Sequence, residues 1–122
     1  MQGYPEENEL LSLFECEPTF LETPSDSIDF FYSEATYKFS NKDEDFVVTI
    51  APSYGEVNIR VTNRYSKNII AYLDLKRVYH FEITADKKDS SSILMIIDVG
   101  SNTQTIEIDF KPNFKLIFKE HF

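Results

Sequence analysis

The chain has 122 residues, of which 42% are hydrophobic and 15% aromatic, a composition that argues against disorder and fits one domain with one core. Its 21 Asp and Glu residues outnumber its 12 Lys and Arg residues, and the formal net charge is -9. Such a charge disfavours nucleic acid and anionic membrane surfaces as direct ligands and favours a basic partner. Acidity that serves only solubility is the other interpretation, and the charge alone leaves both open.

The N-terminal segment predicts one short helix over residues 5–16. Pro5 is tolerated in a first helical turn, and the carboxylates that follow it complement the positive end of the helix dipole. Pro18 prevents continuation, and residues 17–29 predict a linker that leads to the strands. The apolar residues that recur at helical spacing along the segment are Leu10, Leu11, Leu13 and Phe14.

From residue 30 to residue 119 the apolar residues recur with a period of two, which is typical of half-buried β-strands. Polar turns separate about eight such segments, and connections this short favour antiparallel neighbours. The sequence therefore predicts a single, mainly β domain over residues 1–122. Its expected architecture is an antiparallel meander of about eight strands that forms a β-sandwich or a partly open barrel, with one short N-terminal helix.

Two stretches allow more specific predictions. Ile69 to Leu75 is mostly apolar on both sides, which predicts a central strand. The alternation then changes phase, so a bulge or a tight corner is expected near residues 74–77. Beyond it, Tyr79 is predicted on the same side of its strand as Phe81 and Ile83.

The sequence carries no recognisable catalytic or metal-binding motif. Cys16 is the single cysteine and excludes an intramolecular disulfide, and His80 and His121 have no companions at metal-ligand spacing. Neither a Gly-x-Ser-x-Gly elbow nor a glycine-rich phosphate loop occurs. We therefore expect no enzyme activity, no cofactor and no bound metal. Asp98, between two apolar residues, is the carboxylate with the most unusual expected environment if its face is buried.

The segment before residue 12 carries carboxylates where a secretory signal needs a positive patch, and no apolar run reaches about 18 residues. A cytoplasmic location is therefore predicted.

Carboxylates and tyrosines at turns and on polar strand faces predict a protein-binding surface. Tyrosine is enriched at protein interfaces because its ring can be buried while its hydroxyl stays wet. An acidic run fills one turn, and two further acids share a face because they stand two residues apart on one strand. The predicted partner-binding residues are Asp43, Glu44, Asp45, Tyr54, Glu56, Tyr65, Glu107 and Asp109.

The short acidic chain, the helix Pro5 to Cys16 and the strand series Glu34 to Phe118 together resemble small immunity proteins of bacterial polymorphic and contact-dependent toxin systems. The resemblance implies a basic partner made by the same cell, typically a nuclease toxin domain, whose active-site cleft the inhibitor covers. Two alternatives stay open. One is an accessory or regulatory β domain, such as a phage or host factor, that docks on another protein complex. The other is a small-molecule-binding barrel, which needs a closed apolar cavity.

Overall fold

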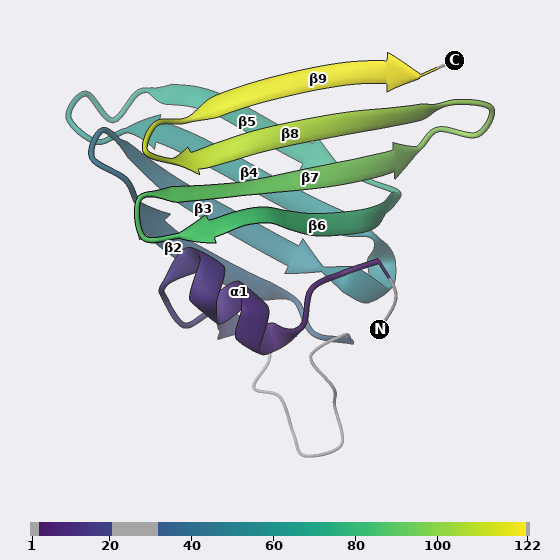
Figure 1. The fold of residues 1–122 in the computed structure, drawn as a ribbon, viewed down its shortest axis with the longest axis horizontal. Coiled ribbons are helices and arrows are strands. Elements are labelled where there is room, and N and C mark those ends of the chain that lie inside the picture. The colour runs from purple at the N-terminus through teal and green to yellow at the C-terminus, as the bar shows by residue number, and fades with distance from the viewer. Residues whose placement is uncertain (1–2, 21–31, 122) are drawn as a thin grey trace.

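The computed structural model describes residues 3–20 and 32–121. Within them the chain forms one α-helix and nine strands, and the strands form two antiparallel sheets. The first sheet has the strand order β1-β2-β3-β4-β5 and the second has the order β6-β7-β8-β9 (Figure 1). The elements are α1 (Glu7–Phe14), β1 (Thr19–Phe20), β2 (Ala35–Ser40), β3 (Glu44–Ala51), β4 (Glu56–Asn63), β5 (Ile69–Leu75), β6 (Val78–Lys87), β7 (Ser90–Asp98), β8 (Thr103–Lys111) and β9 (Lys115–His121).

The two sheets face each other as a sandwich, so the predicted fold class is confirmed in its sandwich form. Neighbours within each sheet are also neighbours in sequence, and short turns join β2 to β5 and β6 to β9 as two successive meanders. The chain leaves the first sheet after Leu75 and enters the second at Val78, so the predicted corner near residues 74–77 is confirmed. Arg77 has a φ of 59° there, and the N–H of Val78 donates to the carbonyl oxygen of Gly55 at 2.8 Å.

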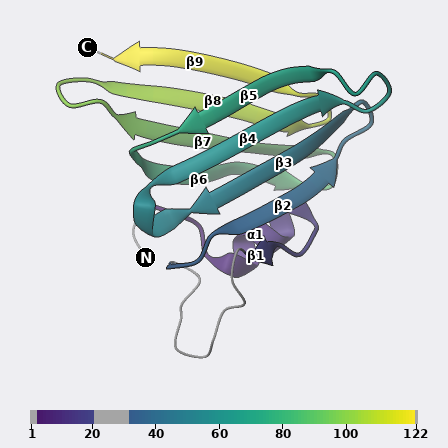
Figure 2. The ribbon, with the colours of Figure 1, turned by 180° about the vertical axis from the view of Figure 1, so that it is seen from behind.

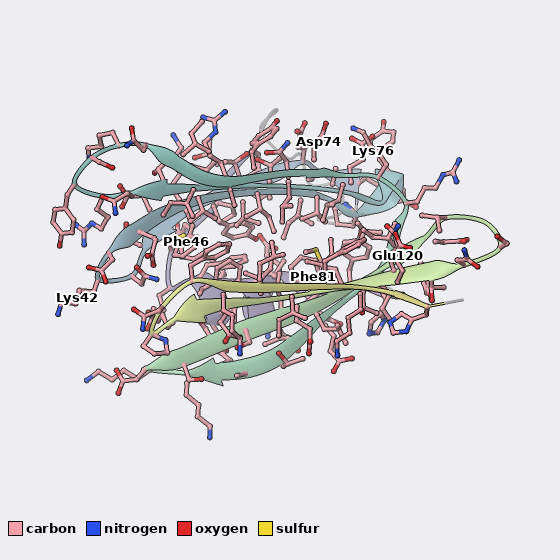
Figure 3. The ribbon with its side chains drawn as sticks, turned by 90° about the horizontal axis from the view of Figure 1, so that it is seen from above. Lys42, Phe46, Asp74, Lys76, Phe81 and Glu120 are labelled. Atoms are coloured by element: carbon pink, nitrogen blue, oxygen red, sulfur yellow. The ribbon has the colours of Figure 1, made fainter. Side chains whose placement is uncertain are left out.

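The core lies between the sheets and follows from the period of two. In β4, Val57, Ile59 and Val61 are buried while the residues between them are more exposed. β7 and β8 bury alternate residues in the same way. Phe46 of β3 and Phe81 of β6 both point into the space between the layers (Figure 3). One face of every such strand is therefore used for the core, and its polar face remains outside.

The predicted helix forms over Glu7–Phe14, inside the expected range. A capping box joins Glu6 and Glu9, and Glu15 ends the helix in a left-handed conformation with a φ of 56°. The helix lies along the side of the sandwich formed by β2 and β6 (Figures 1 and 2). Its buried residues are Leu10, Leu13 and Phe14.

The prediction that Ile69 to Leu75 is a central strand is wrong. β5 is the last strand of the first sheet, and among the described residues it pairs with β4. Residues 69–75 immediately precede the corner to the second sheet, and that topology leaves them at an edge. The predicted orientation of Tyr79 is also wrong, because a bulge between Val78 and His80 turns its side chain outward, where it is 52% exposed.

Part of the predicted linker belongs to the first sheet. Thr19 and Phe20 form β1 and pair with Thr36 and Ala35 of β2. This short strand brings the number of strands in the described residues to nine, where about eight were expected for the chain. The rest of the predicted linker, from residue 21, and the first two residues of the predicted sheet, 30 and 31, lie outside the described residues.

Phe14 connects the helix to both sheets, and truncating its side chain should destabilise the fold. Its ring centroid lies 4.8 Å from that of Tyr37, 4.6 Å from that of Phe39 and 5.7 Å from that of Phe110. We expect Phe14→Ala to lower the free energy of unfolding by about 3–5 kcal/mol, because it leaves a cavity that three elements surround. Urea denaturation followed by circular dichroism measures this. Tyr54→Ala, at an exposed position, is the control, and its free energy of unfolding should stay within about 0.5 kcal/mol of the parent value. Equal losses in the two variants would contradict the packing role of Phe14.

Tyr37 gives the fold a predictable response to high pH. Its side chain is fully buried, and its hydroxyl has no hydrogen-bond partner among the described residues. Burial, and then the charges of Glu7 and Cys16, raise the pKa of Tyr37 far above its ordinary value. Burial likewise raises the pKa of Tyr4. The unfolded chain therefore releases these protons at lower pH than the folded chain does. The resulting stability is present below about pH 10 and is lost as the pH rises above it.

We therefore expect the free energy of unfolding of Tyr37→Phe at pH 7 to equal that of the parent protein or to exceed it by up to about 1 kcal/mol. The reason is that the substitution removes a desolvated hydroxyl without a partner. Above about pH 10 the variant should lose stability less steeply, by about 1.4 kcal/mol per pH unit. Urea titrations between pH 7 and pH 11 give both quantities. A destabilised variant at pH 7, or one with the parental alkaline slope, would contradict this account.

Candidate functional site

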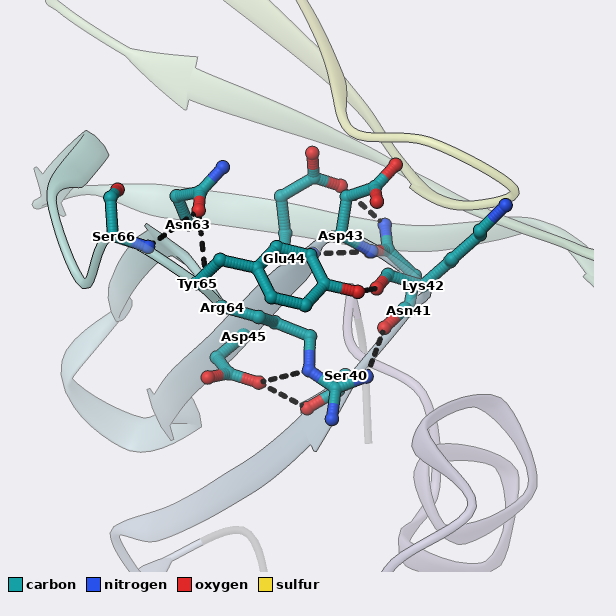
Figure 4. Close-up of polar contacts among 10 residues, drawn as sticks. All are labelled: Ser40, Asn41, Lys42, Asp43, Glu44, Asp45, Asn63, Arg64, Tyr65 and Ser66. Carbon is teal, nitrogen blue, oxygen red and sulfur yellow. Dashed lines mark hydrogen bonds and ion pairs between the residues drawn. The ribbon is translucent and has the colours of Figure 1, made fainter.

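The acidic run Asp43 to Asp45 lies at the turn between β2 and β3, and the buried side chain of Asn41 organises that turn (Figure 4). Asn41 Oδ1 accepts hydrogen bonds from the backbone N–H groups of Asp43 at 2.9 Å and Glu44 at 2.7 Å. Asn41 Nδ2 donates to Glu44 Oε1 and to the carbonyl oxygen of Phe110, both at 2.7 Å. Because Phe110 belongs to β8, one side chain fixes the acidic turn relative to the second sheet.

The three carboxylates of the run have different surroundings. Glu44 Oε1 also accepts from the backbone N–H of Phe114 at 3.3 Å, so Glu44 links the turn to the segment before β9. Asp45 Oδ1 lies 3.5 Å from Nε of Arg64 in an exposed ion pair. The carboxylate of Asp43 has no hydrogen-bond or ion-pair partner within the described part of the chain. Asp43 is therefore the member of the run with a carboxylate available to a partner.

Tyr65 lies against the same turn, although it comes from the turn between β4 and β5 (Figure 4). Its hydroxyl donates to the carbonyl oxygen of Lys42 at 3.1 Å, and Asn63 Oδ1 accepts from its backbone N–H at 2.9 Å. The backbone N–H of Arg64 donates to the carbonyl oxygen of Asp43 at 3.0 Å. The two turns therefore form one surface, which we call the hairpin end and define by Asp43, Asp45 and Tyr65.

Tyr54 and Glu56 lie at the other end of the β3–β4 hairpin. The two ends are separated by the eight residues of β3, or roughly 23 Å of extended strand. Glu56 and Asp74 each lie 3.5 Å from Nζ of Lys76, and Asp74 and then Glu56 raise the pKa of that amine. Figure 3 shows Asp74 and Lys76 on the outside of the sandwich. A hollow of about 250 Å³ is lined by Glu34, Glu56, Asp74 and Lys76, among other residues. We call this surface the corner end and define it by Tyr54, Glu56 and Asp74.

Glu107 and Asp109 share the outer face of the second sheet, as their spacing predicts. Ser92 Oγ donates to Asp109 Oδ1 at 2.8 Å, and Lys115 Nζ lies 3.4 Å from Asp109 Oδ2. Glu107 is exposed and has no hydrogen-bond or ion-pair partner among the described residues. The structure thus distributes the eight predicted residues over three places: Asp43, Glu44, Asp45 and Tyr65 meet at one turn, Tyr54 and Glu56 lie at the corner end, and Glu107 and Asp109 lie on the other sheet.

The remaining candidates have ordinary surroundings. Asp98 does not lie on a buried face. It is exposed at the end of β7, and its Oδ1 accepts a hydrogen bond from the N–H of Gly100 at 2.9 Å. His80 Nε2 lies 3.0 Å from Glu82 Oε1. Cys16 packs partly against the core, and burial raises the pKa of its thiol, opposed by a backbone hydrogen bond from Lys38.

Residues 3–20 and 32–121 contain no grouping of three or more His, Cys, Asp or Glu side chains suited to a metal ion. In the same residues no helix is long and apolar enough to cross a membrane.

Sequence reasoning missed Glu34 and Asp74 as neighbours of Glu56. Asp74 was visible as an acid that interrupts an apolar strand, but its proximity to Glu56 depends on the register in which β5 pairs with β4. Glu34 belongs to the segment before β2 and reaches the hollow through the pairing of β2 with β3. Neither relation has a signal in local sequence.

The chain matches no family model and no curated protein. Its fold is similar to that of a chain in a solved structure described as a contact-dependent growth inhibition toxin–immunity protein complex from Klebsiella pneumoniae 342. The TM-score is 0.71 at 24% sequence identity, and the match covers 98% of this chain and 96% of that chain. The fold is therefore one found in a toxin–immunity complex, and the resemblance inferred from the sequence is confirmed at the level of the fold.

The different roles of Asn41 and Asp43 can be separated by mutation. We expect Asn41→Ala to lower the free energy of unfolding by about 2–3 kcal/mol, because a buried side chain with several hydrogen bonds is lost. Asp43→Ala, two residues away, should change it by less than about 0.5 kcal/mol because its carboxylate has no partner in the described structure. Chemical denaturation of the two variants side by side measures the difference, and a stable Asn41→Ala variant would exclude the role given to the amide.

Proposed function

We propose that this chain is an immunity protein that binds and neutralises a toxin domain of the same cell. The observation that carries the proposal is the likeness of fold over 98% of the chain to a component of a toxin–immunity complex. The net charge of -9 supports the role of inhibitor over that of a toxin acting on nucleic acid, because such a toxin has to approach phosphates. On this proposal the chain acts by binding, in the cytoplasm, and performs no catalysis.

We further propose that the partner is a basic toxin domain, with a nuclease as the leading class, and that the inhibitor covers its active site. Carboxylates that occupy the place of nucleic-acid phosphates accelerate association with a cationic cleft and orient the complex. Asp43 and Glu107 are suited to this because their exposed or half-exposed carboxylates have no partner in the described structure. Glu44 contributes indirectly, since its carboxylate holds the turn that presents Asp43.

The predicted residues define two candidate docking surfaces. Asp43, Asp45 and Tyr65 at the hairpin end, and Tyr54 and Glu56 at the corner end, belong to the first sheet. Glu107 and Asp109 form the second candidate surface, on the outer face of the second sheet. We favour the first because acids and exposed tyrosines occur together at both of its ends. Tyrosine beside carboxylate suits a basic protein surface, since the ring adds contact area and cation–π stabilisation.

The test is co-expression with the product of the adjacent gene. We expect this product to arrest growth when expressed alone, and to co-purify with the chain and lose its toxicity when both are present. A neighbouring product that is not toxic, or that remains toxic in complex with this chain, would contradict the proposal and favour an accessory role.

Charge reversal separates the two surfaces. Asp43→Lys and Glu56→Lys should each raise the Kd for the adjacent gene's product about tenfold and reduce its salt dependence. Glu17→Lys is the matched control, because it changes the net charge equally at an exposed position outside both surfaces. Calorimetry at two salt concentrations measures both effects. A large loss in Glu107→Lys with none at Asp43 and Glu56 would move the interface to the second sheet.

A further inference from the structure

The two long sides of the sandwich differ, because the helix covers one of them and two edge strands form the other. On one side the helix packs against β6 and β2 and buries its apolar face between them. The opposite side consists of β5 and β9, the last strands of the two sheets, and both views place them away from the helix (Figures 1 and 2). An edge strand presents unpaired N–H and C=O groups to any chain that can pair with them.

Most sheet edges in the described structure carry features that discourage pairing. β1 has two residues. β6 is covered by the N-terminal segment, in which the carbonyl oxygen of Gly3 accepts from the N–H of Phe81 and Tyr4 Oη donates to the carbonyl oxygen of Val78. β9 carries Lys115, Lys119 and Glu120 along its seven residues. Short strands, covering segments and charged side chains are the usual ways in which proteins protect edges.

β5 is neither short, covered by a described segment nor rich in charge; its one irregularity is a register shift against β4 that leaves Ile70 without a pairing partner. It is seven residues long, with the sequence Ile-Ile-Ala-Tyr-Leu-Asp-Leu and one charged residue, Asp74. Ile69, Ile70 and Tyr72 are 63%, 46% and 53% exposed. Leu73 and Leu75 turn toward the core, so β5 is firmly part of the sheet and still offers apolar side chains to the solvent. An unprotected apolar edge of this kind is a site for strand addition.

The side chain of Tyr72 is already held in place. Asn58 Nδ2 donates to its hydroxyl at 2.9 Å, and the guanidinium carbon of Arg60 lies 5.7 Å from its ring centroid. Asn58 and Arg60 are partners of Asp74 and Tyr72 in the β4–β5 pairing, so the outer surface next to the edge is ordered before anything binds. A preorganised aromatic side chain loses little conformational entropy when a partner covers it.

Acidic groups lie at both ends of this edge. The hairpin end, with Asp43 and Asp45, adjoins the start of β5, and the corner end includes Asp74 near its finish and Glu56 beside it. Asp45 is paired with Arg64, and Lys76 is shared by Glu56 and Asp74, so Asp43 is the acid whose carboxylate has no partner in the described structure. We propose that β5 is the docking edge of this protein, at which an extended segment of the toxin domain adds as a further strand of the first sheet. This segment has apolar residues against Ile70 and Tyr72 and basic residues toward the two acidic ends. The inference rests on the proposed function.

Charge favours a basic partner over a second copy of the chain at this edge. Two copies that paired through β5 would bring together two molecules of net charge -9, whereas a basic domain is attracted to both ends of the strand. The hydrogen bonds of strand addition are independent of sequence, so the side chains and charges around β5 would provide the specificity.

Hydrogen–deuterium exchange on the complex with the product of the adjacent gene tests the strand directly. The amides of residues 69–75 that point away from β4 should exchange at least tenfold more slowly in the complex, while those of residues 115–121 in β9 should keep their rates. Ile70→Lys should raise the Kd at least tenfold, because a charge on the edge opposes both pairing and a basic partner. Ile70→Val, which keeps the edge apolar, should bind like the parent.

The matched control is Ile117→Lys, which makes the same change on the other open strand and should leave the Kd within about twofold. Thermal melting of each free variant establishes that it is folded. A product that does not bind the parent protein overturns the proposed function and this inference with it. Parental affinity in Ile70→Lys, without protection of residues 69–75, overturns this inference alone. A parent protein that sediments as a dimer and an Ile70→Lys variant that sediments as a monomer would assign the edge to a second copy and also overturn it.

Discussion

Aromatic packing between the sheets is the interaction on which the rest of this structure depends. The cluster joins Phe14 from the helix, Phe39 and Phe46 from the first sheet and Phe110 from the second sheet. Phe39 and Phe110 each contact the other three rings, with ring centroids 4.6–5.7 Å apart. Each of these rings removes a large apolar area from water, and edge-to-face contacts add to the gain. Because one cluster includes residues from all three parts of the fold, the helix cannot leave its side of the sandwich without exposing the core.

The same cluster determines where the acidic turn stands. The carbonyl oxygen of Phe110 accepts a hydrogen bond from Asn41, whose side chain also holds the backbone of Asp43 and Glu44. The aromatic cluster therefore fixes the position of β8 in the sandwich, and the hydrogen bond from the Asn41 amide connects β8 to the acidic turn. A carboxylate that attracts a partner is most effective when its position is fixed before binding, and Asp43 owes its fixed backbone to this arrangement.

The helix also explains why the two sides of the sandwich differ. One α-helix with three buried residues closes the side formed by β2 and β6, and the described residues place no comparable element over β5 and β9. The edge that carries Ile70 and Tyr72 is consequently the one away from the helix. Charge and apolar surface would then have separate tasks at this edge: the acids raise the rate and the selectivity of encounter, and the strand provides contact area and backbone hydrogen bonds.

The sequence by itself determined the helix, the strands after residue 34 and the overall charge of this protein, but not the short strand β1. Helical spacing around Leu10 and Phe14 and the alternation of Val57, Ile59 and Val61 are local patterns, and the corresponding helix and strand formed where they were predicted. The tertiary structure decided which strands became edges, that Glu44 holds a turn, and that the predicted acids separate into three places. Alternation defines two faces of a strand without stating what lies beside it, so an apolar run such as Ile69 to Leu75 fits a central strand and an open edge equally well. The order of strand pairing makes this segment an edge strand: it pairs with β4, and the chain crosses to the second sheet directly after Leu75.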